Sequence, residues 1–143
     1  MSSRKILILE EDHHLQWVMK TYLESKGFTA VIADRGDKAL EIASKDKFSI
    51  FITEYWIDHS NTLSIIKKLK AMMPRLYVLL NTYRVINEVE YQAILEAGVD
   101  HLIEKPFSFE KLIIYLKEGS IKKGEKFIGS ESLKINSCKP GPN

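Results

Sequence analysis

The sequence predicts a doubly wound α/β domain with a five-stranded parallel sheet, because five short apolar runs alternate with longer segments of helical periodicity. The apolar runs suit strands buried on both faces of a sheet, and the longer segments suit helices that cover those faces. The five predicted strands are residues 5–9, 29–33, 49–53, 76–80 and 101–103. With 143 residues, the chain is long enough for one such domain with its own core.

Amphipathic helices are predicted between and after these runs, because apolar residues recur at every third or fourth position. The predicted helices are residues 14–25, 37–44, 62–72 and 87–97, with a last one that starts at residue 108. Gly27 and Gly98 supply C-terminal stops for the first and fourth helices, and the Ser108 hydroxyl is placed to cap the last. Trp17 lies beside the apolar stripe of the first helix and is expected to pack against the core.

Composition and charge favour an ordinary cytoplasmic globular protein. The chain is 45% apolar and 28% charged, and no apolar stretch approaches the roughly 18–20 residues that a membrane span requires. The polar start of the chain has no signal-peptide apolar region, so no membrane partner is expected. A net charge of +2 is too small to argue for nucleic-acid binding, and the single cysteine, Cys138, indicates no metal or redox role.

The helical pattern fails after residue 118. We therefore expect a domain that spans residues 4–118, followed by a linker or C-terminal tail at residues 119–143. This last segment holds five Lys and two Glu, so it is a basic part of the chain. Whether the chain is whole or a piece of a longer protein stays open.

Charged and polar residues follow several of the predicted strands. Carboxylates end the first strand (Glu10, Glu11 and Asp12) and the third strand (Glu54), Thr82 follows the fourth, and Lys105-Pro106 follows the fifth. In an open parallel sheet, the ligand crevice lies at the carboxyl ends of the strands, so these side chains are expected to meet at one edge. The sequence therefore predicts an acidic pocket with one cation.

The order and joint spacing of these landmarks resembles the receiver domain of two-component response regulators, over about residues 4–118. The resemblance implies a flavodoxin-like sheet of strand order 2-1-3-4-5 with five helices. In receivers the acidic pair helps to hold Mg²⁺, a strand-end aspartate takes a phosphoryl group from a histidine kinase, and the hydroxyl and the lysine bind the phosphoryl oxygens. It also implies a phosphorelay signalling module that binds protein partners, with a homodimer among them, and no enzyme.

Glu54 replaces the aspartate that receivers phosphorylate. Glutamate is one methylene longer, so its carboxylate lies about 1.5 Å further out, and a misplacement on the order of 1 Å already costs about a hundredfold in rate. We therefore expect an atypical pseudo-receiver in which Glu54 faces Lys105 and is not phosphorylated in the usual way. The loop at residues 57–62 lacks the Pro and Gly that the family commonly has there, so Mg²⁺ at Glu10 and Glu11 is expected to be weak or absent, and no other cofactor is expected.

Several alternatives stay open at this point. A competent receiver would accept phosphate at another carboxylate, such as Asp58 or Asp12. A small enzyme or cofactor binder would use the same crevice, since the fold alone does not fix function. Within the pocket, either Asn81 or Thr82 fills the position that receivers reserve for a hydroxyl, and Trp56 is a candidate lid.

An interaction surface is expected on the fourth and fifth helices and the last strand. Tyr91 is predicted on the outer side of the fourth helix, and Tyr115 near the outer edge of the fifth. Leu102 stands where many receivers keep an aromatic residue that moves upon activation. Together these residues are expected to form an exposed apolar patch, the kind of surface that marks an interaction site.

Overall fold

A computed structural model describes residues 4–83 and 86–121 of the chain. Its main sheet consists of β1 (Lys5–Leu9), β2 (Thr29–Ala33), β3 (Ile50–Glu54), β6 (Tyr77–Thr82) and β7 (His101–Glu104). The strands lie in the order β2-β1-β3-β6-β7, and each neighbouring pair is parallel. Counted within this sheet alone, the order is 2-1-3-4-5, so the predicted fold class and topology are confirmed.

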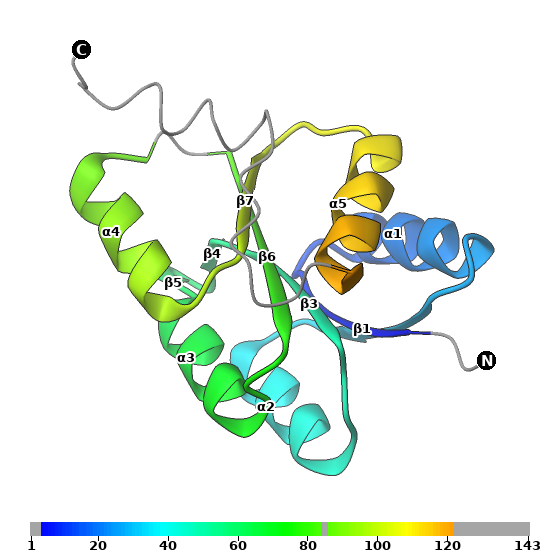
Figure 1. The fold of residues 1–143 in the computed structure, drawn as a ribbon, viewed down its shortest axis with the longest axis horizontal. Helices are drawn as coiled ribbons and strands as arrows, with labels where there is room; N and C mark the ends of the chain where they lie inside the picture. The colour runs from blue at the N-terminus through cyan, green and yellow to red at the C-terminus, as the bar shows by residue number, and fades with distance from the viewer. Residues whose placement is uncertain (1–3, 84–85, 122–143) are drawn as a thin grey trace.

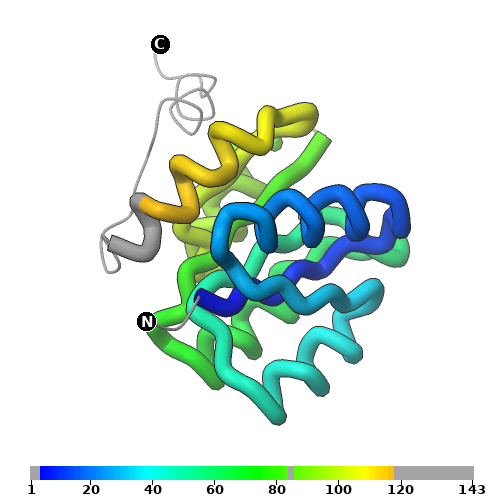
Figure 2. The backbone as a smooth tube through the Cα atoms, turned by 90° about the vertical axis from the view of Figure 1, so that its right-hand side faces the viewer, coloured from blue at the N-terminus to red at the C-terminus, as the bar shows by residue number. Residues whose placement is uncertain are grey.

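Within the described residues, five helices cover the two faces of the sheet (Figure 1). They are α1 (His13–Ser25), α2 (Gly36–Lys45), α3 (Leu63–Met72), α4 (Glu88–Ala97) and α5 (Phe109–Ile121). Helices α1 and α5 lie on one face, and α2, α3 and α4 lie on the other, an arrangement that Figure 2 shows from the side. Each predicted helix is present, with its ends shifted by a few residues at most.

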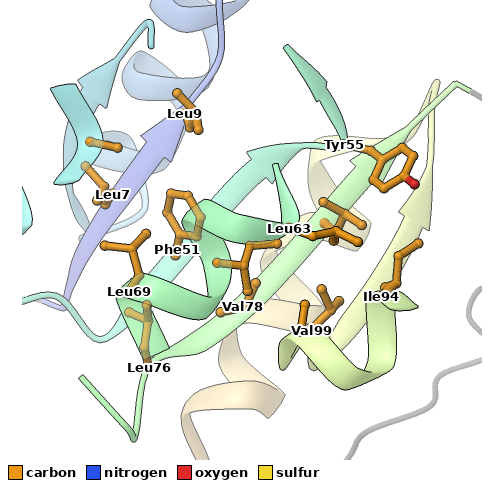
Figure 3. Close-up of a cluster of buried hydrophobic side chains, with 14 of the residues drawn as sticks. Leu7, Leu9, Phe51, Tyr55, Leu63, Leu69, Leu76, Val78, Ile94 and Val99 are labelled. Atoms are coloured by element: carbon orange, nitrogen blue, oxygen red, sulfur yellow. The ribbon is translucent and has the colours of Figure 1, made fainter. Parts of the chain in front are cut away.

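Successive side chains of a strand point to opposite faces of the sheet, so the core consists of two clusters, one on each face. In β1, Leu7 and Leu9 belong to the cluster beneath α2, α3 and α4, which Figure 3 shows packed around Phe51. Ile6 and Ile8 belong to the cluster beneath α1 and α5. Every residue of β6 is buried, so helices cover this strand on both faces of the sheet.

Local hydrogen bonds fix the helix ends that border the functional edge of the sheet. Asp12 caps α1, since its Oδ1 accepts from the backbone N–H of His14 at 2.9 Å and of Leu15 at 3.1 Å. Asn87 and Glu90 form a reciprocal capping box at the start of α4. The predicted Ser108 cap is present as well, because its Oγ accepts from the Lys111 N–H at 3.1 Å.

A short antiparallel hairpin, which the sequence did not predict, follows β3. Strands β4 (Trp56–Ile57) and β5 (Ser60–Asn61) pair with each other around a two-residue turn. Asp58 and His59 form that turn with φ of 54° and 65°, the left-handed backbone that a tight hairpin requires. The usual signal for such a turn is Asn-Gly or Asp-Gly, so the pair Asp-His gave no indication of it.

The predicted exposure of the apolar patch is wrong, because all three of its residues are buried. Tyr91, Leu102 and Tyr115 are only 8%, 4% and 5% exposed. Tyr91 and Leu102 lie in the core beneath α2, α3 and α4, and the Tyr115 ring packs 4.1 Å from the ring of His101. Tyr91 lies on the same inward-facing side of α4 as Ile94. The prediction, which counted back from the end of the helix, assigned Tyr91 to the outer side and was therefore wrong by about one helix position.

The large apolar side chains that do reach the surface lie elsewhere. Trp17 is 67% exposed, so the expectation that it packs against the core is also wrong. Val89 on α4 and Ile114 on α5 are 79% and 52% exposed. None of the described helices is long and apolar enough to cross a membrane.

The end of the last helix lies beyond the domain boundary that the sequence suggested. Helix α5 continues through Gly119 to Ile121. Residues 122–143, which include Cys138 and most of the expected tail, lie outside the described residues.

We predict that Gly27→Ala and Gly98→Ala both lower the free energy of unfolding, but by different amounts. Their φ angles are +97° and +106°, a backbone conformation that costs an alanine about 1–2 kcal/mol. A Cβ at Gly98 would also lie 3.2 Å from the Lys70 side chain, whereas a Cβ at Gly27 meets nothing within 4 Å. Urea denaturation should therefore show the larger loss for Gly98→Ala, and equal losses would contradict a cost from the Lys70 contact.

Candidate functional site

The carboxyl ends of three strands bring a lysine and two glutamates together. Lys105, just after β7, donates from Nζ to Glu54 Oε1 at the end of β3, and its Nζ lies 3.4 Å from Oε1 of Glu10, just after β1. The three side chains are 5%, 11% and 6% exposed, respectively. This triad is thus a buried ion cluster at the edge where the sequence predicted a pocket.

The three consecutive acids after β1 have three different surroundings. Glu10 turns into the pocket, where its Oε2 accepts from the backbone N–H of Asp12 at 3.1 Å. Asp12 itself caps α1, and Glu11 is exposed to solvent. Of the predicted acidic pair, the structure therefore brings Glu10 to Lys105 and leaves Glu11 on the surface.

Lys105 is held from several sides. Its backbone N–H donates to the Thr82 carbonyl at 2.9 Å, which ties β7 to β6. The Tyr83 ring, which is 72% exposed, lies with its centroid 4.9 Å from Nζ and covers the cation. Sequence reasoning missed Tyr83, although an aromatic residue directly after the fourth strand was a usable signal.

Strand register distinguishes the two polar residues at the end of β6. Asn81 is the register partner of Glu54, so the side chains of these two residues point to the same face of the sheet. Thr82 is the next residue in the strand and pairs with Glu104, so its side chain points to the opposite face. Both Asn81 and Thr82 are buried at 2% exposed. Asn81 Oδ1 has no hydrogen-bond partner among the described residues. Asn81 is therefore the polar residue next to Glu54.

The protonation of the triad is set by burial and by its own charges. Burial raises the pKa of Glu54 to about 7, Lys105 opposes this rise, and the charge of Glu10 adds to it. Burial alone would lower the pKa of Lys105, but the hydrogen bond to Glu54 and the charges of both glutamates outweigh it and raise that pKa. Lys105 thus stays an ammonium ion, and Glu54 is the member that titrates near neutrality.

These donors do not fit a divalent cation well. Mg²⁺ requires near-octahedral oxygen ligands, and in this pocket the two buried carboxylates already face an ammonium group. Asp12 is occupied by the helix cap and Glu11 points to solvent. Within residues 4–83 and 86–121, no group of three or more His, Cys, Asp or Glu side chains is placed to hold a metal ion.

The loop after β3 connects the pocket to α4. Thr62 Oγ1 donates to the Glu54 carbonyl at 2.8 Å and closes the hairpin against the strand end. Tyr55 follows Glu54 directly, and its buried hydroxyl donates to Glu90 Oε2 at 3.3 Å, in the capping box of α4. The structure puts Asp58 at the exposed hairpin turn.

Comparison with known proteins gives a consistent set of relatives. The family model described as the response regulator receiver domain matches residues 6–117. A protein described as an NtrX-like response regulator of Rickettsia typhi is 33% identical over 122 residues, which cover 82% of this chain and 25% of that protein. The transcriptional regulatory protein CpxR of Escherichia coli K12 is 25% identical over 113 residues, which cover 79% of this chain and 47% of that protein.

Solved structures support the same fold. The chemotaxis response regulator CheY4 of Vibrio cholerae has a TM-score of 0.74 at 19% identity, with 82% of this chain and 98% of that chain covered. A CheY-like receiver domain protein of Methanospirillum hungatei has a TM-score of 0.77 at 22% identity, with 82% of this chain and 93% of that chain covered. The chain spans about a quarter of the length of the NtrX-like proteins that it matches.

We predict that Glu54 and Lys105 are energetically coupled. At about pH 8 Glu54 is ionised in the wild type, so Lys105→Met removes the counter-charge of both buried acids and should cost about 3 kcal/mol or more of unfolding free energy. Glu54→Gln should stabilise the fold at this pH, because the raised pKa of Glu54 means that burial disfavours its charged form, and Glu10 still faces the ammonium group. In a urea-denaturation double-mutant cycle, the two changes should couple by about 1–3 kcal/mol, and a coupling of zero would refute the pairing.

The stability of the protein should also depend on pH through Glu54. Because its folded-state pKa of about 7 lies above the ordinary value of 4.5, the folded protein binds this proton more tightly than the unfolded chain. The resulting stabilisation is fully present below about pH 4.5 and is lost as the pH rises through 7. Wild type should therefore lose on the order of 2 kcal/mol relative to Glu54→Gln across this window, and parallel stability profiles would contradict the raised pKa.

Proposed function

The chain belongs to the response regulator receiver domain family, and we propose that within it the chain acts as a pseudo-receiver, a signalling module that works without phosphorylation of Glu54. The observation that carries this proposal is the Lys105 ammonium group held against the carboxylates of Glu54 and Glu10. Lysine and strand-end acid are the groups that receivers use to hold a phosphoryl group. Here they satisfy each other, so the pocket is electrostatically complete in the unmodified chain.

Three physical arguments support a lack of phosphorylation at Glu54. Its carboxylate is bound by Lys105, and an in-line attack requires a free, correctly placed nucleophile. With a pKa of about 7, a large share of Glu54 is protonated at neutral pH and cannot attack phosphorus. A phosphoryl group would also bring further negative charge next to the buried carboxylate of Glu10.

We extend the proposal to the metal. In receivers Mg²⁺ offsets the charge of the acidic cluster and of the transferred phosphoryl group. In this chain Lys105 already lies between both buried acids, so the proposed module keeps its charge balance without Mg²⁺. The polar neighbour Asn81 contributes a neutral oxygen, which adds little to the affinity for a cation.

The proposed module acts through a protein partner, either a signalling target or an output domain, with a second copy of the chain as a further candidate. Its pocket would hold the same cation at all times, because Lys105 is part of the chain whereas a phosphoryl group is added and removed. The link from Tyr55 to Glu90 then fixes the first turn of α4 in a matching position. Binding of the partner would therefore need no activating modification.

The first test is direct phosphorylation. After incubation of the chain with acetyl phosphate and Mg²⁺, we expect an unchanged intact mass, because Glu54 is paired and longer than aspartate. Glu54→Asp should gain at most a small phosphorylated fraction, since the hairpin after β3 is unchanged. Wild type that gains one phosphoryl group in stoichiometric yield would overturn the proposal, and loss of that gain in Asp58→Asn or Asp12→Asn would identify a different acceptor.

A further inference from the structure

A second cavity lies at the opposite edge of the sheet, where β3 and β6 begin. Its volume is about 440 Å³. We call it the amino-end cleft and define it by the side chains of Arg4, Lys47, Phe48, Met72, Met73 and Arg75. These residues come from the start of the chain, from the segment before β3, and from the end of α3 with the loop that follows. The cleft shares no residue with the buried triad.

The rim of the amino-end cleft is basic. Arg4, Lys47 and Arg75 are exposed, and none of them has a carboxylate within 4 Å among the described residues. The nearby Asp46 is taken by Lys5. The Arg4 guanidinium carbon lies 5.1 Å from the centre of the Phe28 ring, which does not neutralise its charge. Within the part of the chain that the structure describes, the three cations therefore create a positive field over the opening, which attracts an anionic ligand.

The floor of the amino-end cleft is apolar and adaptable. Phe48 is 6% exposed, with Lys5 Nζ 5.7 Å from the centre of its ring, and Met72 is 44% exposed. Met73 also lines the cleft and is partly buried. Methionine side chains adjust their shape to irregular partners, so this floor suits an apolar side chain.

One backbone donor in the floor has only a weak acceptor. The N–H of Phe48 donates to Sδ of Met73 at 3.4 Å. A thioether sulfur is a much weaker acceptor than a carbonyl or carboxylate oxygen. An oxygen acceptor within reach of this N–H would therefore form a stronger hydrogen bond with it than the sulfur does.

We propose that the amino-end cleft binds an acidic peptide segment of a partner protein. An apolar side chain of the segment packs on Phe48 and the two methionines, flanking carboxylates pair with the rim cations, and one oxygen accepts from the Phe48 N–H. Charge complementarity selects this occupant. Residues 119–143 hold five Lys and two Glu, so the end of this chain has the wrong charge. This inference does not depend on the phosphorylation state of Glu54.

The test is a titration of the full ¹⁵N-labelled chain with short acetylated peptides. One pool places Leu, Met, Phe or Trp between Asp and Glu residues, and a second pool replaces the acids by Asn and Gln. We expect the acidic pool alone to bind and to shift the Phe48 amide proton downfield. The double substitution Lys47→Glu with Arg75→Glu should weaken binding by about tenfold or more, with a further loss in high salt.

A matched control carries the same change of net charge elsewhere. Lys38 on α2 and Lys117 on α5 are exposed and lie outside the cleft, so Lys38→Glu with Lys117→Glu should leave the affinity nearly unchanged. The proposal is overturned if the acidic pool does not bind, if both double variants bind equally, or if the Phe48 amide does not move. Self-association that depends on Lys47 and Arg75 in sedimentation would overturn it too, because the occupant would then be a second copy.

Discussion

The pairing of Lys105 with two buried carboxylates is the interaction on which the functional edge of this molecule depends. Burying one acid near another is unfavourable, and a buried lysine without a counter-charge is equally so. Together the three groups compensate one another, and each is delivered by a different strand end. The three ion-pair partners therefore meet only when β1, β3 and β7 are in the correct register, so formation of the ion cluster depends on correct assembly of the sheet.

Periodicity predicted the architecture well, because in a doubly wound fold the apolar runs and amphipathic segments are long and regular. The meeting of Glu54 and Lys105 was also accessible from the sequence, since both residues follow parallel strands whose carboxyl ends share one edge. What the sequence could not give was which side chain of an adjacent pair faces inward. A shift of one residue moved Tyr91 from the surface to the core and made Asn81, rather than Thr82, the neighbour of Glu54.

The hairpin after β3 escaped prediction for a different reason. Its two strands are too short to leave a periodic signal, and its turn uses Asp58 and His59 where glycine is the usual choice. Trp17 shows a related limit, because a large apolar residue at the border of a helical stripe falls on either side of it with small changes in helix rotation. Tertiary contacts determine whether such a side chain is buried or exposed, and these contacts cannot be inferred from the sequence of a single protein.

The hydrogen bond from Tyr55 to Glu90 couples the local unfolding of two segments. Glu54 and Tyr55 are neighbours in the chain, yet one belongs to the ion cluster and the other reaches the first turn of α4 on the far face of the sheet. Fraying of that turn must break the capping box and release the tyrosine hydroxyl at the same time. The end of β3 and the start of α4 consequently form one cooperative unit, whose amide protons would exchange with solvent together.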